Sequence, residues 1–571
     1  MNRATDKLPL LFLGVVLAVM TALMWGPMRN ETATVDETTF MGGGYAYFKT
    51  GSCRMAEENP LLAQMLIAAP MLALDVHVSG QAQALMESRA VSPVGWRWDV
   101  TFAPVGQLFP DGVNWYHDSV AEAQFFGKIL VYDPANDAER LLFWSRFTQL
   151  LLTLATTVFV FFWARELTAN AWAGLMAAVL WAFNPAALGY GHLAITEPGI
   201  SLTYAVAIWW FTRTVASPRP RNAFILGALT ALALQMKLLA LILMPSYVAL
   251  LGLWWLRERR IAPVKQLAKL TGLFLAGGWV MTMAIYFPHC APPPPIDYGQ
   301  ARELRVPDWF TTFRPLLAPG EFAKAVTLKL LHSQVGQDAF LMGQWSKMGW
   351  WYYYPVVLWF KTPVPLILLT AVAAALLLRR VRSAPYAALV PWAATALYVL
   401  SALTSKIDIG VRHVMPIYPL LAVGAVDQLT RLDRKWRIGA WAGCAWLAAV
   451  AFSAYPDFLP YCNVFAGGTA NGYREIIDSN YDWGQDGKRL KQWMADNHVD
   501  HIYLDFFGTQ TAIEWYGIPN TRVDAQSAQQ ILQGYLVVSV SELMRPEWDW
   551  LRTQRQPVAR IGYTLFVYRF P

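Results

Sequence analysis

Two neighbouring carboxylates, Asp36 and Glu37, lie within ten residues of the end of the first long apolar segment. A carboxylate so close to the apolar part of a bilayer is costly, and it can take a proton from an acceptor hydroxyl or amine, or orient that group. Both side chains also suit a solvated loop or the cap of a helix. We interpret residues 34–72, which include a glycine run at 42–44, as a loop that forms the chemical centre of a membrane enzyme.

Further carboxylates occur at two other places beside apolar segments. Glu57 and Glu58 precede Pro60, where acidic residues also favour the first turn of a helix. Glu197 lies between two apolar runs and is followed by Pro198. A carboxylate in that position is a functional hypothesis, although Glu-Pro is also an ordinary helix start.

Cations are found at the predicted outer boundary of the membrane as well. Arg412 and His413 lie in residues 404–416, between two apolar segments. Cations at headgroup level suit a phosphate, and an arginine can bind two of its oxygens at once. Lys237, which interrupts an apolar stretch, and Lys347, beside an aromatic run, allow the same interpretation. The alternative is that these side chains extend to the phosphates of ordinary lipids.

Composition indicates the class of protein. The chain has 571 residues, of which 56% are hydrophobic and 15% charged, and its mean hydropathy is +0.31. Soluble proteins carry about 25% charged residues. The net charge of +7 is clustered by membrane side, so we do not predict nucleic-acid binding. The four cysteines lack CxxC spacing, so we predict no metal site from them.

The apolar segments predict a mainly α polytopic membrane protein with about 11 transmembrane helices. The stretch 223–256 is too long for one helix and is split into two near Lys237. Residues 61–74 are too short to span and predict an amphipathic helix at the interface. The predicted spans are residues 8–27, 141–164, 171–190, 195–212, 223–256 (two helices), 267–287, 362–378, 384–401, 415–428 and 438–455.

The distribution of basic residues predicts the orientation. The short connections on the side of the N-terminus hold 17 of the 46 Lys and Arg residues within only 47 positions. The positive-inside rule makes that side cytoplasmic. The long segments 28–135 and 288–361 and the C-terminus are then extracytoplasmic. The first apolar segment is too long for a cleaved signal peptide and lacks an A-x-A site, so we expect it to be an uncleaved span.

The tail has a different composition. We predict a transmembrane domain over residues 1–455 and a soluble extracytoplasmic α/β domain over residues 456–571. The expected strands, rich in β-branched and aromatic residues, are 501–507, 535–540 and 563–569. Residues 486–497 have helical spacing.

An ordered set of motifs extends over nearly the whole chain. It reads VDETT with GYAYFKTG, EENPLLAQ, ITEP, QDAFLMGQWSKMGWWYYYP with FKTPVPL, SKIDIGVRHVMPIYPLL, and FAGGTANGYREIIDSNYDWGQDGKRLKQW. In this order the motifs resemble glycosyltransferase family 39 of the GT-C fold, which includes protein O-mannosyltransferases and the lipid A aminoarabinose transferase. The chain departs from the family's common pattern at Asn59, where many members have His, and at Glu197, where most have Asp.

The resemblance implies an inverting transfer of sugar from a polyprenyl-phosphate donor to an unknown acceptor, which is a protein, a lipid or a polysaccharide. It further implies a bacterial inner-membrane protein with a periplasmic C-terminus, and no metal or cofactor besides the lipid-linked donor. Asp36 would be the base, with Glu37 and Glu58 next in line. The residues expected around the donor are Arg412, His413, Lys347, Lys237, Glu58 and Glu197.

Two other classes of protein remain as alternatives. A non-catalytic member of the family would bind a lipid-linked glycan or assemble a complex. A secondary transporter would also have many spans, but transporters show paired repeats and broken helices at mid-membrane. In this sequence no repeat is evident, and the charges lie toward one surface.

Overall fold

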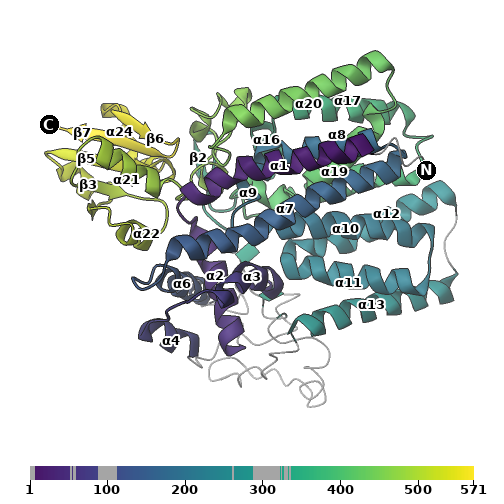
Figure 1. The fold of residues 1–571 in the computed structure, drawn as a ribbon, viewed down its shortest axis with the longest axis horizontal. Coiled ribbons are helices and arrows are strands. Elements are labelled where there is room, and N and C mark those ends of the chain that lie inside the picture. Colours follow the sequence, from purple (N-terminus) through teal and green to yellow (C-terminus); the bar gives the residue numbers. More distant parts are fainter. Residues whose placement is uncertain are drawn as a thin grey trace.

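The computed structural model describes residues 7–51, 55, 59–87, 112–259, 263–286, 322, 325–326, 329, 332–333 and 336–571, with only the backbone given for 112–121. The described chain is mainly α-helical. Long helices run along the longest axis of the molecule, and a small sheet lies beyond one end of them (Figure 1). This agrees with the predicted fold class.

Every predicted span coincides with a helix or a pair of short helices. Five helices are long and apolar enough to cross a membrane by themselves, and α16 with α17, bent by 116°, is a further candidate among the described residues. The chain is therefore an integral membrane protein, and about 11 spans stays a prediction. The helices that lie along the predicted spans are α1 (Lys7–Asn30), α7 (Ala138–Thr168), α8 (Ala171–Ala182), α9 (Pro185–Tyr190), α10 (Glu197–Ala216), α11 (Pro220–Met236), η4 (Leu238–Ile242), α12 (Leu243–Glu258), α13 (Val264–Tyr286), α16 (Tyr353–Lys361), α17 (Val364–Arg380), α18 (Tyr386–Ala402), α19 (Ile417–Leu429) and α20 (Arg434–Ala454).

The segment interpreted as a loop, 34–72, is largely helical, which corrects that prediction. It forms α2 (Val35–Thr50), α3 (Leu61–Ala68) and η2 (Ala69–Ala73). Glycine disfavours a helix by about 1 kcal/mol per residue, but here close packing compensates. A Cβ atom at Gly42 would lie 2.7 Å from the Cα atom of Gly127 in α6 (Gly112–Val131), and one at Gly44 would lie 2.1 Å from the carbonyl oxygen of Gln64.

Contacts with α2 also determine what surrounds residues 61–74. That segment is helical as predicted, but α3 packs against α2, where Gln64 and Ala68 lie next to Gly44. Its position at a membrane interface stays a prediction. The long segments 28–135 and 288–361 hold, besides these helices, α4 (Gly80–Glu87) and the hairpin of β1 (Ala339–Leu341) and β2 (Gln344–Ser346).

The C-terminal module, residues 487–570, contains a five-stranded sheet in the order β4-β3-β5-β7-β6. Strand β3 is parallel to β4 and β5, whereas β7 is antiparallel to β5 and β6. The three predicted strands and the predicted helix are confirmed. The elements are α21 (Gly487–Asp496), β3 (Ile502–Asp505), α22 (Gln510–Trp515), β4 (Asn520–Arg522), η10 (Ser527–Gln530), β5 (Gly534–Ser539), α23 (Val540–Leu543), η11 (Pro546–Trp548), α24 (Asp549–Gln554), β6 (Ala559–Ile561) and β7 (Leu565–Phe570).

The predicted domain boundary at residue 456 stays a prediction, because the chain beyond it keeps close contact with the helices. Lys361, buried at the end of α16, donates to the carbonyl oxygens of Leu459 and Asn480, each at 2.7 Å. The intervening segment contains only short turns of helix: η7 (Val464–Ala466), η8 (Gly472–Arg474) and η9 (Asp478–Asn480). Residues 457–486 thus connect the helical part to the sheet.

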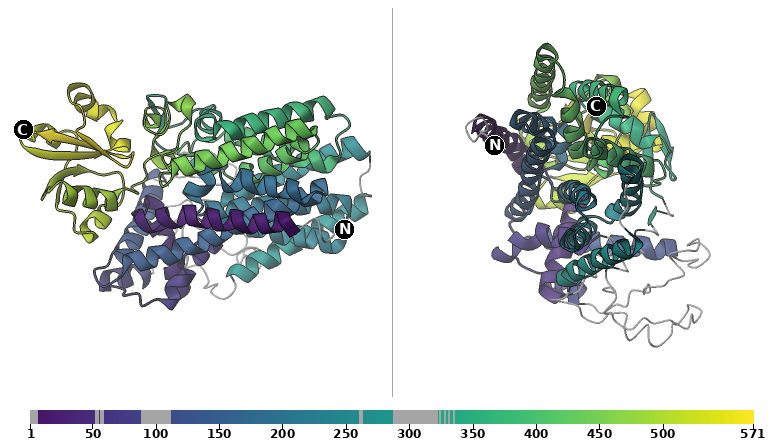
Figure 2. Two further views of the ribbon diagram at one scale, coloured as in Figure 1. Left: turned by 45° about the horizontal axis from the view of Figure 1, so that its top comes forward. Right: turned by 90° about the vertical axis from the view of Figure 1, so that its right-hand side faces the viewer.

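The topology can be tested by cysteine labelling. The two chain ends lie at opposite ends of the molecule (Figures 1 and 2). In a background with the four native cysteines replaced by serine, an impermeant thiol reagent should label Ser527→Cys in intact cells. It should label Ser383→Cys, in the basic connection after α17, only after permeabilisation. The reverse pattern would refute a cytoplasmic N-terminus.

Candidate active site

A cavity of about 710 Å³ lies where the helical part meets the C-terminal module. Its walls come from α2, α6, the β1–β2 hairpin, the short helix η6 (Val411–Val414), η9, the end of β4, the loop after β3, and α23. Asp36, in the first turn of α2, and Arg412, in η6, both line it. Elements that are far apart in the sequence therefore form a single site.

Asp36 and Arg412 form an ion pair at this cavity. Arg412 Nη1 donates to Asp36 Oδ2 at 2.8 Å, although the residues are 376 positions apart. The Asp36 side chain is 27% exposed and that of Arg412 only 7%. Among the described residues, none donates to Asp36 Oδ1. One carboxylate oxygen is thus held in place, and the other remains available as a proton acceptor.

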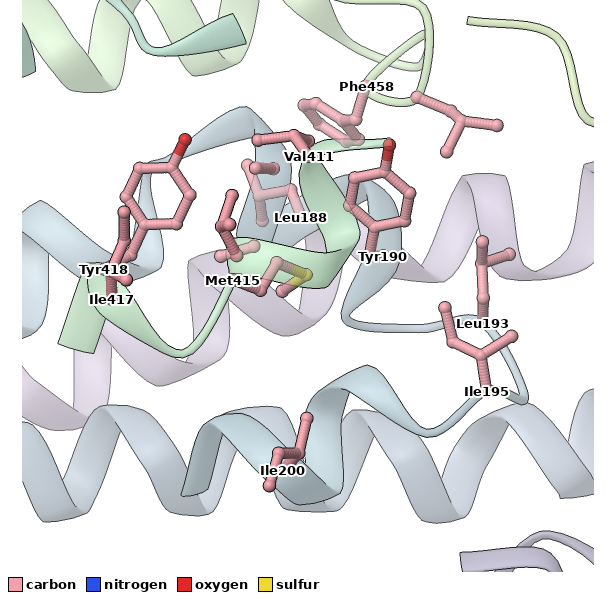
Figure 3. Packing of buried hydrophobic residues seen from close by; sticks show 14 of the residues in the cluster. Leu188, Tyr190, Leu193, Ile195, Ile200, Val411, Met415, Ile417, Tyr418 and Phe458 are labelled. Carbon is pink, nitrogen blue, oxygen red and sulfur yellow. The ribbon is translucent and has the colours of Figure 1, made fainter. Parts of the chain in front are cut away.

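Two further side chains hold Arg412 in place. Its Nε donates to Ser479 Oγ at 3.1 Å, and its guanidinium lies 4.2 Å from the centre of the Trp483 ring. Burial lowers the pKa of Arg412, but Asp36 and Glu197 raise it above its ordinary value, so the side chain stays charged. Figure 3 shows how η6 packs: Val411 and Met415 lie beside Leu188 and Tyr190.

Glu197 and Lys237 continue the row of charges away from the cavity. Lys237 Nζ lies 2.6 Å from Glu197 Oε1, and Arg412 Nη1 lies 3.7 Å from the same oxygen. Glu197 begins α10 and is fully buried, while Lys237 follows the end of α11 and is 8% exposed. Because acids and bases alternate from Asp36 to Lys237, none of these buried charges lacks a partner.

The other predicted donor residues occupy different positions. His413 is next to Arg412, and among the described residues its Nε2 has no hydrogen-bond partner. Burial, with Lys237 and Arg412, lowers the pKa of His413 well below its ordinary value, so the ring is neutral. Lys347 lines the cavity from the side of the hairpin. Glu58 lies outside the described residues.

Glu37 points away from the cavity into the protein. Its two oxygens accept hydrogen bonds from Arg146 Nε and Nη2, each at 2.7 Å, and from the backbone N–H groups of Ala194 and Thr34, each at 2.8 Å. Burial raises the pKa of Glu37, but Arg146 outweighs it and the net shift is downward. The structure thus gives Glu37 the helix-capping position, and of the two neighbours only Asp36 lines the cavity.

Arg146 joins α7 to the segment between α1 and α2. Besides its two bonds to Glu37, its Nη1 donates to the carbonyl oxygens of Met28 and Glu31 and its Nη2 to that of Thr32, at 2.9, 3.1 and 3.0 Å. All five guanidinium N–H groups therefore have an acceptor. This buried pair fixes the start of α2, and with it the position of Asp36.

Comparison with known proteins agrees with the resemblance seen in the motifs. Residues 141–286 match the family described as dolichyl-phosphate-mannose-protein mannosyltransferase. That range runs from α7 to the end of α13. The chain is thus similar to membrane glycosyltransferases of the GT-C type, as the motifs predicted.

Two solved structures are similar along nearly the whole chain. One is ArnT from Cupriavidus metallidurans bound to undecaprenyl phosphate, with 12% identity and a TM-score of 0.46. The other is the same protein in the apo state, with 11% identity and a TM-score of 0.48. In both cases 97% of each chain is covered. No curated protein matches this chain.

Several residues at or beside the cavity were missed by the interpretation of this GT-C-like sequence. Ser479 and Trp483 hold Arg412, and Asp478 lines the cavity with φ 58°. Burial raises the pKa of Asp478 to about 6. The sequence feature that contains these residues is the tail motif, which is rich in polar and aromatic residues. That motif contributed to the family resemblance, but we predicted no site residue in it.

Metal ligands were not predicted. Within the part of the chain that the structure describes, no group of three or more His, Cys, Asp or Glu side chains could hold a metal ion. Metal-independent transfer stays a prediction.

Proposed function

We propose that the chain is an inverting glycosyltransferase that moves a sugar from a polyprenyl-phosphate donor to an acceptor on the extracytoplasmic side. The matched family is described by a dolichyl-phosphate-linked sugar, which supports a lipid-linked donor. The apolar helices provide a surface for its tail. The observation that carries the proposal is Asp36, held by Arg412 at the cavity beyond the ends of these helices.

The reaction follows from this arrangement. An acceptor hydroxyl or amine that enters the cavity loses its proton to Asp36 Oδ1 as its oxygen or nitrogen attacks the anomeric carbon. The bond from that carbon to the phosphate oxygen breaks, the configuration inverts, and polyprenyl phosphate leaves with the bonding electrons. Arg412 stabilises the charge that develops on this phosphate.

Arg412 has donors left for this task. Its Nε is occupied by Ser479 and one Nη1 donor by Asp36, whereas no described residue accepts a hydrogen bond from Nη2. A phosphate can therefore approach Arg412 while the bond to Asp36 persists. Lys237, paired with Glu197 behind it, adds a second positive charge on the side of the helices.

Release of polyprenyl phosphate is the direct test. Purified protein in lipid nanodiscs is incubated with a panel of polyprenyl-phosphate sugars and extracted membrane and periplasmic acceptors. Time-dependent release of polyprenyl phosphate with at least one donor is expected. Tight donor binding with no release from any member of the panel would instead favour the non-catalytic alternative.

Arg412→Ala should weaken donor use far more than folding. A charge-assisted hydrogen bond to phosphate contributes about 1.5–3 kcal/mol, so donor affinity should fall about 10- to 100-fold. The matched control is Arg213→Ala, since Arg213 also forms a pair with a carboxylate, Glu166, at 2.7 Å but at the other end of the helices. Equal donor affinity and turnover in both variants would remove Arg412 from the donor site.

A further inference from the structure

The parallel strands of the C-terminal module point their carboxyl ends at the cavity. Arg522 is the last residue of β4, Phe506 follows β3 directly, and Ser541 follows β5. All three line the cavity, and β4, β3 and β5 are neighbours with parallel pairing. Ligands of open α/β sheets bind outside the carboxyl ends of such strands. The module therefore presents its own binding edge to the site of Asp36.

At this edge two cations lie in each other's field, and no described carboxylate is within ion-pair distance of either. Lys128 of α6 and Arg522 of β4 both line the cavity. Burial and the charge of Arg522 lower the pKa of Lys128, which places the two side chains in each other's field. Within the described ranges, no acid lies within 4.0 Å of either cation and neither side chain donates a hydrogen bond. Two neighbouring cations are unfavourable until an anion joins them.

Two other charged side chains at this edge already have partners. Arg545 is paired with Glu542 at 2.8 Å and stacks on Trp345 at 4.9 Å. Asp505, within the field of Arg522, accepts a hydrogen bond from the Trp548 indole at 3.1 Å. Lys128 and Arg522 are therefore two cavity cations that no described carboxylate approaches within 4.0 Å.

We propose that Lys128 and Arg522 form a subsite for an anionic group, a phosphate or a carboxylate, that the acceptor carries. That the bound molecule is an acceptor rests on the function proposed above. A lipid-linked donor keeps its tail among the helices and meets Arg412 and Lys237 at their ends. Lys128 of α6 and Arg522 of β4 line the cavity beside the C-terminal module. The sheet of this module extends beyond the ends of the long helices (Figures 1 and 2). A soluble or headgroup anion reaches them without displacing the donor.

Binding of small anions tests the subsite directly. The full-length protein is placed in neutral phosphatidylcholine nanodiscs saturated with a short polyprenyl phosphate, and glycerol 3-phosphate or glycerate is titrated in by calorimetry. At least one of these probes should still bind, and their comparison tells phosphate from carboxylate. The double variant Lys128→Gln, Arg522→Gln should weaken this binding at least about tenfold, the loss expected for one charge-assisted contact.

The controls separate this subsite from the donor site. The double variant should keep its affinity for polyprenyl phosphate within about twofold, while Arg412→Ala should lose that affinity and keep the soluble anion. Lys435→Gln with Arg437→Gln, at the start of α20, should change neither. Thermal unfolding of the Lys128→Gln, Arg522→Gln variant should match the wild type, because neither side chain donates a hydrogen bond to any described residue.

Each other outcome has a defined meaning. Unchanged anion binding in the double variant, or no binding of either probe, would overturn the subsite. Complete competition between the soluble anion and polyprenyl phosphate would assign the two cations to the donor and would also overturn it. Anion binding that depends on Lys128 and Arg522, in a protein that never releases polyprenyl phosphate, would support the anion subsite and refute the transferase proposal.

Discussion

Replacing Asp36 by Asn should abolish sugar transfer and leave the protein folded and able to bind donor. Asn retains the size of the side chain and an oxygen that can accept from Arg412, but it loses the negative charge and the basic Oδ1. A positioned proton acceptor accelerates a reaction by about 10²–10⁴-fold, and the rate should fall by that factor. Turnover of a lipid-linked sugar is the measurement, beside thermal unfolding and donor binding.

The control for this variant is Glu166→Gln, which removes another carboxylate paired with an arginine, Arg213, at the opposite end of the helices. Its turnover should equal that of the wild type. Near wild-type turnover for Asp36→Asn would transfer the role of the base to another cavity carboxylate, of which Asp478 is the first to examine.

Arg146→Met should lower the free energy of unfolding by about 3–5 kcal/mol, the usual effect of leaving a buried charge without its partner. Neither Arg146 nor Glu37 has any exposed side-chain surface. Met fills much of the same volume but provides none of the five hydrogen bonds. Unfolding in detergent, followed by heat or denaturant, gives the difference.

Two further variants make this result specific. Arg213→Met removes an exposed pair and should cost only about 0–1 kcal/mol. The double variant Arg146→Met, Glu37→Gln should recover part of the lost stability, because no unpaired charge remains buried. If Arg146→Met were as stable as Arg213→Met, Arg146 would not be what fixes the start of α2.

The helices could be predicted because each depends on a local property. A run of about 20 apolar residues specifies a membrane-length helix without information on its neighbours. Helix α2 could not be predicted in this way. Its glycines at 42–44 disfavour a helix locally, and only the close approach of α6 and Gln64, from other parts of the chain, makes the helix favourable there.

The roles of the site residues also depend on distant parts of the chain. Asp36 and Glu37 are neighbours of the same chemistry, so the sequence alone cannot rank them. Successive residues of a helix point in directions about 100° apart, and this sends one carboxylate to Arg412 and the other to Arg146. Both partners lie more than a hundred residues away.

The structure of the tail could be predicted from the sequence, but its contribution to the site could not. Its strands were recognised from composition, but the predicted boundary at residue 456 separated Ser479 and Trp483 from the arginine that they hold. Nothing local in the tail motif indicates that it packs beside η6. Only the folded chain places these two side chains beside Arg412.

The hold of Ser479 and Trp483 on Arg412 has a consequence for biosynthesis. The sheet beyond these residues is complete only when β7 (Leu565–Phe570) pairs with β5 and β6. Chains fold from the N-terminus as they are made, at about 5–20 residues per second, so the lipid-facing helices enter the membrane well before β7 leaves the ribosome. A stalled or cleaved chain then has the helices but not the completed site. Activity should therefore begin only after synthesis of the last strand, and unfinished copies should not consume lipid-linked sugar.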